Sequence, residues 1–212
     1  MTSDVKRSYD SSGRREQARE AQLRIVRAAH DLFVAQGYGR TTVADIARAA
    51  GVSAESIYST FKTKATLLHR VWDITIGGDD EQVVFHERPE IKAIRAEPDL
   101  RKRFVLHARM STAAARRFAP FLLALRGASG SEPAAAEMLA EVDRQRRAGM
   151  AVMAHEAAAT GQLAVSEQDC LDLIWSTTDG LLWHRLVQER GWSDEHYADL
   201  LARMWIAALV AP

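Results

Sequence analysis

Cysteine is almost absent from this 212-residue sequence, in which Cys170 is the only one. A single cysteine excludes an internal disulfide and a metal site built from a cysteine cluster. No apolar run approaches the roughly 18 residues needed to cross a bilayer, and the longest spans only 204–211. The first 13 residues are polar and lack the apolar segment of a secretory signal. These absences predict a protein of the reducing cytoplasm that makes no membrane contact.

Sequence signatures of catalysis are also missing. The 7 histidines form no HExxH pair, and the chain has no glycine-rich phosphate loop and no nucleophile elbow. His155 and Glu156 are neighbours, which on a helix places their side chains about 100° apart. We therefore expect no enzyme, no metal site and no cofactor. Two functions from other classes are left: a DNA-binding regulator, and a helical carrier of small molecules.

The formal net charge is zero, but the charges are unevenly distributed. Residues 1–70 hold 12 Lys/Arg and 7 Asp/Glu, whereas residues 71–212 hold 16 and 21. A basic first region is typical of one that meets a polyanion such as DNA. Chance clustering on solvated helix faces explains the same numbers equally well. Charge alone therefore does not decide between the two functions.

No segment shows the alternating pattern of a β-strand, and apolar residues recur at helical spacing, so we predict an all-α fold. Pro120 and the Gly/Ser-rich residues 127–131 are expected to interrupt helices, and 81–98 is expected to be irregular with one short helix. The expected helices span 16–36, 43–50, 54–61, 64–76, 99–117, 133–159, 167–190 and 194–210.

Residues 41–68 have the pattern of a helix-turn-helix. Thr42 is predicted to cap helix 43–50, with Asp45 completing a capping box, and Ser53 to cap helix 54–61. Gly51 supplies the left-handed conformation that a tight turn needs, and Ala47 is small enough to let the two helices approach. The predicted inner faces carry Val43, Ile46, Val52, Ile57 and Phe61.

The outward face of the second of these helices is short and polar. Small side chains of this kind let a helix enter a DNA major groove, which is about 12 Å wide. Tyr58 is expected at the flank of that face, although a partly buried core tyrosine fits the same position. The outward residues are Ala54, Glu55, Ser59 and Thr60.

This region, over residues 17–71, resembles the DNA-binding domain of the TetR family of transcriptional regulators. The resemblance rests on many spaced matches in one register: Gly37-Tyr38, Thr41-Thr42-Val43, Ile46-Ala47, Ala50-Gly51-Val52-Ser53, Ile57-Tyr58, Phe61, Lys64 and Leu67-Leu68. It implies a three-helix DNA-binding domain followed by a helical ligand-binding and dimerisation domain. It also implies a homodimeric repressor that binds a pseudo-palindromic operator in double-stranded DNA and is released by a small apolar or aromatic effector.

The resemblance assigns roles to matching positions. Tyr58 and Lys64 would contact phosphates, and Thr42 would anchor the DNA backbone at a helix N-terminus. A solvated surface lysine is the ordinary alternative for Lys64. Ser59 and Thr60 stand where the family usually has larger residues. The expected DNA-contacting set is Arg14, Arg15, Thr41, Thr42, Ala54, Glu55, Ser56, Tyr58, Ser59, Thr60, Lys62 and Lys64.

We predict four divisions of the chain: a flexible basic arm (1–15), the helix-turn-helix domain (16–63), a connecting helix (64–78) and the ligand-binding and dimerisation domain (79–212). Arg14 and Arg15 of the arm either reach a minor groove or phosphates, or belong to a tail without function.

The C-terminal part carries two candidate sets. Apolar stripes on the last two helices suit a four-helix bundle with a second copy, although both stripes could instead face the chain's own core. The dimer set is Leu171, Ile174, Leu182, Leu186, Leu201, Met204 and Ala208. Aromatic residues, methionines and a few polar residues are candidates for an effector pocket, with ordinary core packing as the alternative. The ligand set is Trp72, Phe104, His107, Met110, Phe121, Met150, Met153, Trp175 and Thr178.

Overall fold

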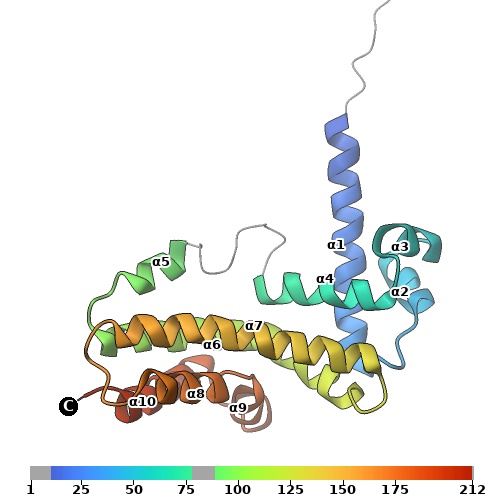
Figure 1. Ribbon diagram of the computed structural model, residues 1–212. Helices are drawn as coiled ribbons and strands as arrows, with labels where there is room; N and C mark the ends of the chain where they lie inside the picture. Colours follow the sequence, from blue (N-terminus) through green and yellow to red (C-terminus); the bar gives the residue numbers. More distant parts are fainter. Residues whose placement is uncertain (1–10, 78–88, 212) are drawn as a thin grey trace, which may run out of the picture.

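A computed structural model describes residues 11–77 and 89–211 (Figure 1). Within these ranges the chain is all-α, as predicted, and its only extended pairing is one isolated antiparallel bridge between Leu163 and Val210. The elements are α1 (Ser11–Gln36), α2 (Val43–Ala50), α3 (Ala54–Phe61), α4 (Lys64–Gly77), α5 (Pro89–Arg95), α6 (Leu100–Ala128), α7 (Pro133–Ala158), α8 (Glu167–Thr177), α9 (Leu181–Trp183), the π-helix η2 (His184–Glu189) and α10 (Asp194–Leu209).

The helices form two regions, which we call the head (α1–α4) and the body (α5–α10). In the body, α6 and α7 are long neighbours, α10 lies along α6 and α8 lies along α7 (Figure 1). Helix α4 packs against both α6 and α7, and α1 crosses it to reach α6. The head is therefore joined to the body through α1 and α4.

The short head helices follow the predicted caps. The Thr42 hydroxyl accepts from the Asp45 backbone N–H at 3.1 Å, while the Asp45 carboxylate accepts from the Thr42 backbone N–H at 3.2 Å. The Ser53 hydroxyl accepts from the Ser56 N–H at 3.1 Å at the start of α3. Gly51 has φ of 67°, the left-handed value that a residue with a Cβ rarely adopts. These contacts confirm both caps and the turn between the helices.

The first helix begins at Ser11 rather than at Glu16, so residues 11–15 are helical and not part of a flexible arm. Residues 1–10, the rest of the predicted arm, lie outside the described residues. The residues that follow Gly13 are mostly Arg, Glu, Gln and Ala, which have high helix propensity and outweigh the cost of that one glycine.

Helix α6 ends at Ala128, eleven residues after its predicted end. The proline that was expected to interrupt it, Pro120, lies inside the helix. A proline removes one backbone N–H and would ordinarily break a helix. Here Phe118, Ala119, Phe121 and Leu122 are all buried, so tertiary packing holds the helix together across the proline. The predicted end at residue 117 was wrong for this reason.

The expected helix 167–190 is divided. Helix α8 ends at Thr177, and the chain restarts in α9 after Gly180, which has φ of 84°. The Asp179 carboxylate accepts from the Leu181 N–H at 2.9 Å across the break. A Cβ on Gly180 would lie 2.9 Å from the Ala119 Cβ, so this glycine is required both by its conformation and by close contact with α6.

Candidate DNA-binding surface and effector region

Helix α3 has one buried face and one polar face. Ile57 and Phe61 are buried in the head core, while Glu55, Ser59 and Thr60 on the outer face are exposed. Ser56 is exposed as well, and Ala54 is half-buried against the core. The core-facing assignments of Ile57 and Phe61 and the outward assignments of Glu55, Ser59 and Thr60 are therefore correct, whereas Ala54 was expected to face outward and instead packs partly against the core.

Tyr58 lies at the edge of the outer face, with 51% of its surface exposed. The alternative of a partly buried core tyrosine is wrong. The hydroxyls of Ser59 and Thr60 donate to the Ser56 carbonyl at 3.0 and 2.9 Å, which keeps these side chains close to the helix. The result is a narrow helix with small hydrogen-bonding groups, a shape that fits a major groove. Lys62 is exposed at the C-terminal end of α3, where its ammonium donates to the Ser59 carbonyl at 3.0 Å.

Thr41 is not available to DNA. Its side chain is 1% exposed, and its hydroxyl donates to the Gly37 carbonyl at 2.8 Å inside the turn between α1 and α2. Thr42 beside it is exposed, and its hydroxyl donates to the Asp45 carboxylate at 2.6 Å. Hydrogen bonds from Thr42 are the main cause that holds the pKa of Asp45 below its usual value. Thr41 is thus a structural residue of the turn, whereas Thr42 is accessible at the N-terminus of α2.

Lys64 is half-buried, so the alternative of a solvated surface lysine is wrong. Its ammonium donates to the carbonyls of Tyr38 and Thr41 at 2.9 and 3.0 Å and lies 4.0 Å from the centre of the Tyr38 ring. Burial lowers the pKa of Lys64, and the nearby carboxylate of Glu132 acts in the opposite direction. Lys64 therefore joins the start of α4 to the turn between α1 and α2. No local sequence pattern predicts this contact.

Two arginines of the predicted arm, Arg14 and Arg15, lie on α1. The side chain of Arg14 lies outside the described residues, and Arg15 is exposed on α1. Figure 1 shows the N-terminal half of α1 extending beyond the rest of the head.

Four of the predicted effector residues belong to ordinary core packing. The Trp72 indole of α4 packs against Phe118 and Phe121, with ring centres 6.1 and 6.4 Å away, and its N–H donates to the Gln145 side chain at 3.1 Å. Phe104 packs edge-on against Trp205. Met153 is also buried in this core, while Met110, Met150 and Thr178 are half-buried.

His107 and Trp175 are different, because they bury polar atoms that have no partner among the described residues. The atoms of these two residues that are buried without a hydrogen-bond partner in the described ranges are both ring nitrogens of His107 and the indole nitrogen of Trp175. Burial, together with the charges of Arg103 and Arg95, lowers the pKa of His107 to about 4, so its ring is neutral near pH 7. Buried polar groups normally find partners, so these two residues are the strongest of the ligand set.

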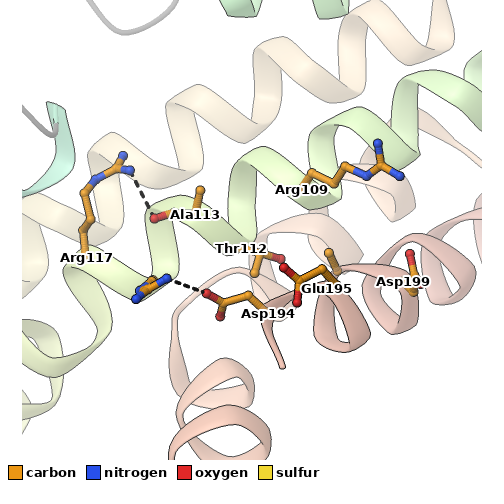
Figure 2. A pocket seen from close by; sticks show the side chains of 9 residues that line it. Arg109, Thr112, Ala113, Arg117, Asp194, Glu195 and Asp199 are labelled. Atoms are coloured by element: carbon orange, nitrogen blue, oxygen red, sulfur yellow. Dashed lines mark hydrogen bonds and ion pairs between the residues drawn. The ribbon is translucent and has the colours of Figure 1, made fainter. Parts of the chain in front are cut away.

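A groove with a volume of about 590 Å³ lies elsewhere, between α6 and α10. Figure 2 shows basic side chains on its α6 side and acidic ones on its α10 side, with Arg116 paired to Asp194 at 3.3 Å. No sequence pattern indicated this groove, and no predicted ligand residue lines it. The lining residues are Arg109, Thr112, Ala113, Arg116, Arg117, Asp194, Glu195, Ala198 and Asp199.

The predicted dimer residues differ in burial. Leu171, Ile174 and Leu201 are buried in the chain's own core, so they are unavailable to a second copy. Leu182, Leu186 and Met204 are half-buried, and Ala208 is exposed. The apolar stripes therefore serve mainly the body's own core, as the alternative interpretation held, and only their outer residues stay accessible.

No helix in the described ranges is long and apolar enough to cross a membrane. The same ranges contain no group of His, Cys, Asp and Glu side chains that could hold a metal ion.

The caps, the turn at Gly51 and the polar face of α3 together define a helix-turn-helix. Residues 25–71 match the family described as bacterial regulatory proteins, tetR family. The match to this family therefore covers the N-terminal helix-turn-helix region of the chain. A segment of 59 residues is 42% identical to the HTH-type transcriptional regulator TtgR of Pseudomonas putida and covers 28% of each protein. A segment of 61 residues is 36% identical to the regulator AcrR of Shigella flexneri and covers 29% of this chain and 28% of AcrR.

Solved structures share the fold over most of the chain. The fatty acid degradation regulator FadR from Bacillus halodurans aligns with a TM-score of 0.70 at 18% identity, covering 88% of this chain and 94% of FadR. NalD of Pseudomonas aeruginosa, a repressor of a multidrug efflux pump, aligns with a TM-score of 0.63 at 18% identity, covering 91% and 98%. SmeT in complex with triclosan aligns with a TM-score of 0.64 at 20% identity, covering 91% and 92%. At these identities the likeness establishes the fold alone.

Proposed function

We propose that this protein is a transcriptional repressor that binds double-stranded DNA through α3. The observation that carries the proposal is the exposed polar face of α3 on a helix held by caps and by a buried opposite face. Glu55, Ser59 and Thr60 would face base edges, and Tyr58 would donate to a phosphate. Thr42 would lie beside the DNA backbone at the N-terminus of α2, where free amides attract anions.

The test uses the full chain and a duplex recovered by repeated selection from random-sequence DNA. Tyr58→Phe should weaken binding by about fivefold, because one hydrogen bond to a charged phosphate is lost. The exposed body residue Val152, replaced by Ala, is the matched control and should leave binding unchanged. Affinity should fall steeply as salt is raised. Failure of the wild-type protein to retain any duplex would refute DNA binding and favour a small-molecule carrier.

We propose that the body assembles two copies in the cytoplasm. Two heads held about 34 to 36 Å apart would read the two halves of a pseudo-palindrome. The half-buried residues Leu182, Leu186 and Met204 and the exposed Ala208 support such a contact. Sedimentation of the full chain should give twice the monomer mass, and a monomer at micromolar concentration would contradict this part of the proposal.

We propose further that a small uncharged aromatic effector binds in the body and hydrogen-bonds to His107. The neutral, unpartnered ring supports this chemistry, and the charges of Arg95 and Arg103 beside it disfavour a cation. SmeT is known in complex with triclosan, and a related fold from Saccharomonospora viridis in complex with choline. These two compounds are therefore suitable probes: triclosan should raise the melting temperature and release DNA, and choline should do neither. The reverse order would contradict the proposed ligand class.

The effector would act by preferring one spacing of the two heads over another, since a ligand shifts an equilibrium only by its differential affinity. Helix α4 is the connection through which the body would change that spacing.

A further inference from the structure

The carboxylate of Glu132, in the turn between α6 and α7, lies against the turn between α1 and α2 of the head. Glu132 precedes Pro133, the first residue of α7, and its side chain makes no capping bond to that helix. A Cβ built on Gly39 would lie 2.8 Å from Glu132 Oε1 and 3.4 Å from its carboxyl carbon. Because φ of Gly39 is not positive, the glycine is needed for close approach and not for its backbone conformation.

The position of this carboxylate is set by the body. The backbone N–H groups of Ser131 and Glu132 donate to the Ala128 carbonyl at 3.0 and 2.9 Å, and the Glu132 carbonyl accepts from Ala135 and Ala136 at 3.0 and 3.2 Å. The turn is thus fixed to the end of α6 and to the start of α7 by its own backbone bonds. Any displacement of these two helices would move the carboxylate with them.

On the head side, the carboxylate meets the cluster formed by Lys64, Tyr38 and Thr41. The Lys64 ammonium bonds to the Tyr38 and Thr41 carbonyls and so connects α4 with the turn that leads into α2. Burial raises the pKa of Tyr38 and lowers that of Lys64, and in both cases the charge of Glu132 acts to raise the pKa. Glu132 therefore acts on the cluster electrostatically, without a close ion pair between its carboxylate and the Lys64 ammonium.

We propose that Glu132 is a positioning residue for DNA binding: its carboxylate holds the Gly39 turn and the Lys64 ammonium in place, so that the body sets the position of α2 and α3. The role rests on the proposed DNA-binding function of the head. The α6–α7 turn would then take part in DNA binding, although it is far from the head along the sequence.

The first test compares Glu132→Gln with Glu137→Gln in the full chain. Both substitutions remove one negative charge from the first turns of α7, and Glu137 is exposed. Removal of any negative charge favours binding to a polyanion. A lower DNA affinity in only one of the two variants is therefore not explained by the change in net charge. With the selected duplex, Glu132→Gln should bind about threefold to tenfold more weakly than Glu137→Gln. Equal affinities of the two variants would overturn the role of Glu132.

A second test uses Gly39→Ala, whose added methyl group would displace the carboxylate without strain in the backbone. We expect it to weaken binding to the same extent as Glu132→Gln. In a Glu132→Ala background, Gly39→Ala should have no further effect, because the three atoms nearest the added methyl group all belong to the Glu132 side chain and are then gone. Additive losses in the double variant would contradict the proposed contact.

A third measurement needs no DNA and separates the failure of this role from the failure of the proposed function. In Glu132→Gln the pKa of Tyr38, followed by NMR, should fall because the carboxylate that raises it is gone. If the wild-type protein retained no duplex, the proposed function would fail whatever the NMR result. If duplex binding were normal while the Tyr38 pKa and the duplex affinity were unchanged by Glu132→Gln, only the role of Glu132 would fail.

Discussion

Both the head and the body cap helices with side chains, but the two regions differ in helix length and in how far packing overrides local signals. In the head, α2 and α3 are eight residues each, and both begin with a side-chain cap, so local bonds define where they start. In the body, α6 has 29 residues and continues through Pro120, so packing along its length overrides a local breaker. The polar groups differ as well: the head exposes Tyr58 and Ser59, whereas the body buries His107, whose ring nitrogens have no hydrogen-bond partner in residues 11–77 and 89–211. Recognition of a large, hydrated surface suits the first arrangement, and recognition of a small enclosed molecule suits the second.

If packing holds the body together, a substitution that disturbs it should have the largest effect on stability. Gly180→Ala combines left-handed backbone with a methyl group 2.9 Å from the Ala119 Cβ, and it should lower the free energy of unfolding by roughly 3 kcal/mol. Gly149→Ala, in the exposed middle of α7 with nothing near its Cβ, should instead raise it by about 0.5 to 1 kcal/mol. Urea unfolding measures both. Equal effects of the two substitutions would show that the contact between α6 and Gly180 is not tight.

The buried imidazole should make the body sensitive to acid. The pKa of His107 falls to about 4 in the folded protein against an ordinary value of 6.5, so the unfolded chain binds the proton more readily. Stability is then full above pH 6.5 and falls as the pH drops towards 4. The loss between pH 7 and 4.5 should be about 2.5 kcal/mol.

His107→Leu should remove this part of the pH dependence, and its stability at pH 7 should equal or exceed that of the wild type because an unpartnered polar group is gone. His155→Gln, at an exposed site, is the control and should keep the acid sensitivity. An identical pH profile for wild type and His107→Leu would mean that His107 is not buried in its neutral form.

In the head the expected effect is smaller, because it depends on a single cap. Thr42→Ala removes the hydroxyl that accepts from the Asp45 N–H, and it should lower the free energy of unfolding by about 1 kcal/mol. Thr42→Ser keeps the hydroxyl and should retain most of that stability. Thermal unfolding of the two variants side by side tests the cap, and equal losses would point to the threonine methyl group instead.

The same contrast explains which features the sequence could predict. The caps at Thr42 and Ser53 and the turn at Gly51 involve residues within a few positions of one another, and all three are confirmed. Tyr58 was placed correctly because the helical period separates it from Ile57 and Phe61. Features that depend on residues close together in the sequence can be predicted from the sequence pattern.

Other features depend on contacts that the local pattern does not show. Thr41 was expected to face DNA, but its hydroxyl donates to the Gly37 carbonyl inside the turn between α1 and α2. Lys64 binds carbonyls of the same turn from the start of α4. Leu171 and Leu201 carry the spacing of an interface, but the stripe alone cannot tell which neighbour covers it. The part played by Glu132 depends on a contact between residues 39 and 132, for which the sequence offers no signal.

Helix α6 belongs to the hydrophobic interior of both regions at once. Its first half packs on α10, where Phe104 meets Trp205, and its second half covers the head, where Phe121 lies beside Trp72 and 6.0 Å from His30. Removal of the body would therefore uncover Trp72, which is 2% exposed in the whole chain. Residues 11–77 expressed on their own would carry an exposed aromatic patch and would aggregate, so the head is not a separable module.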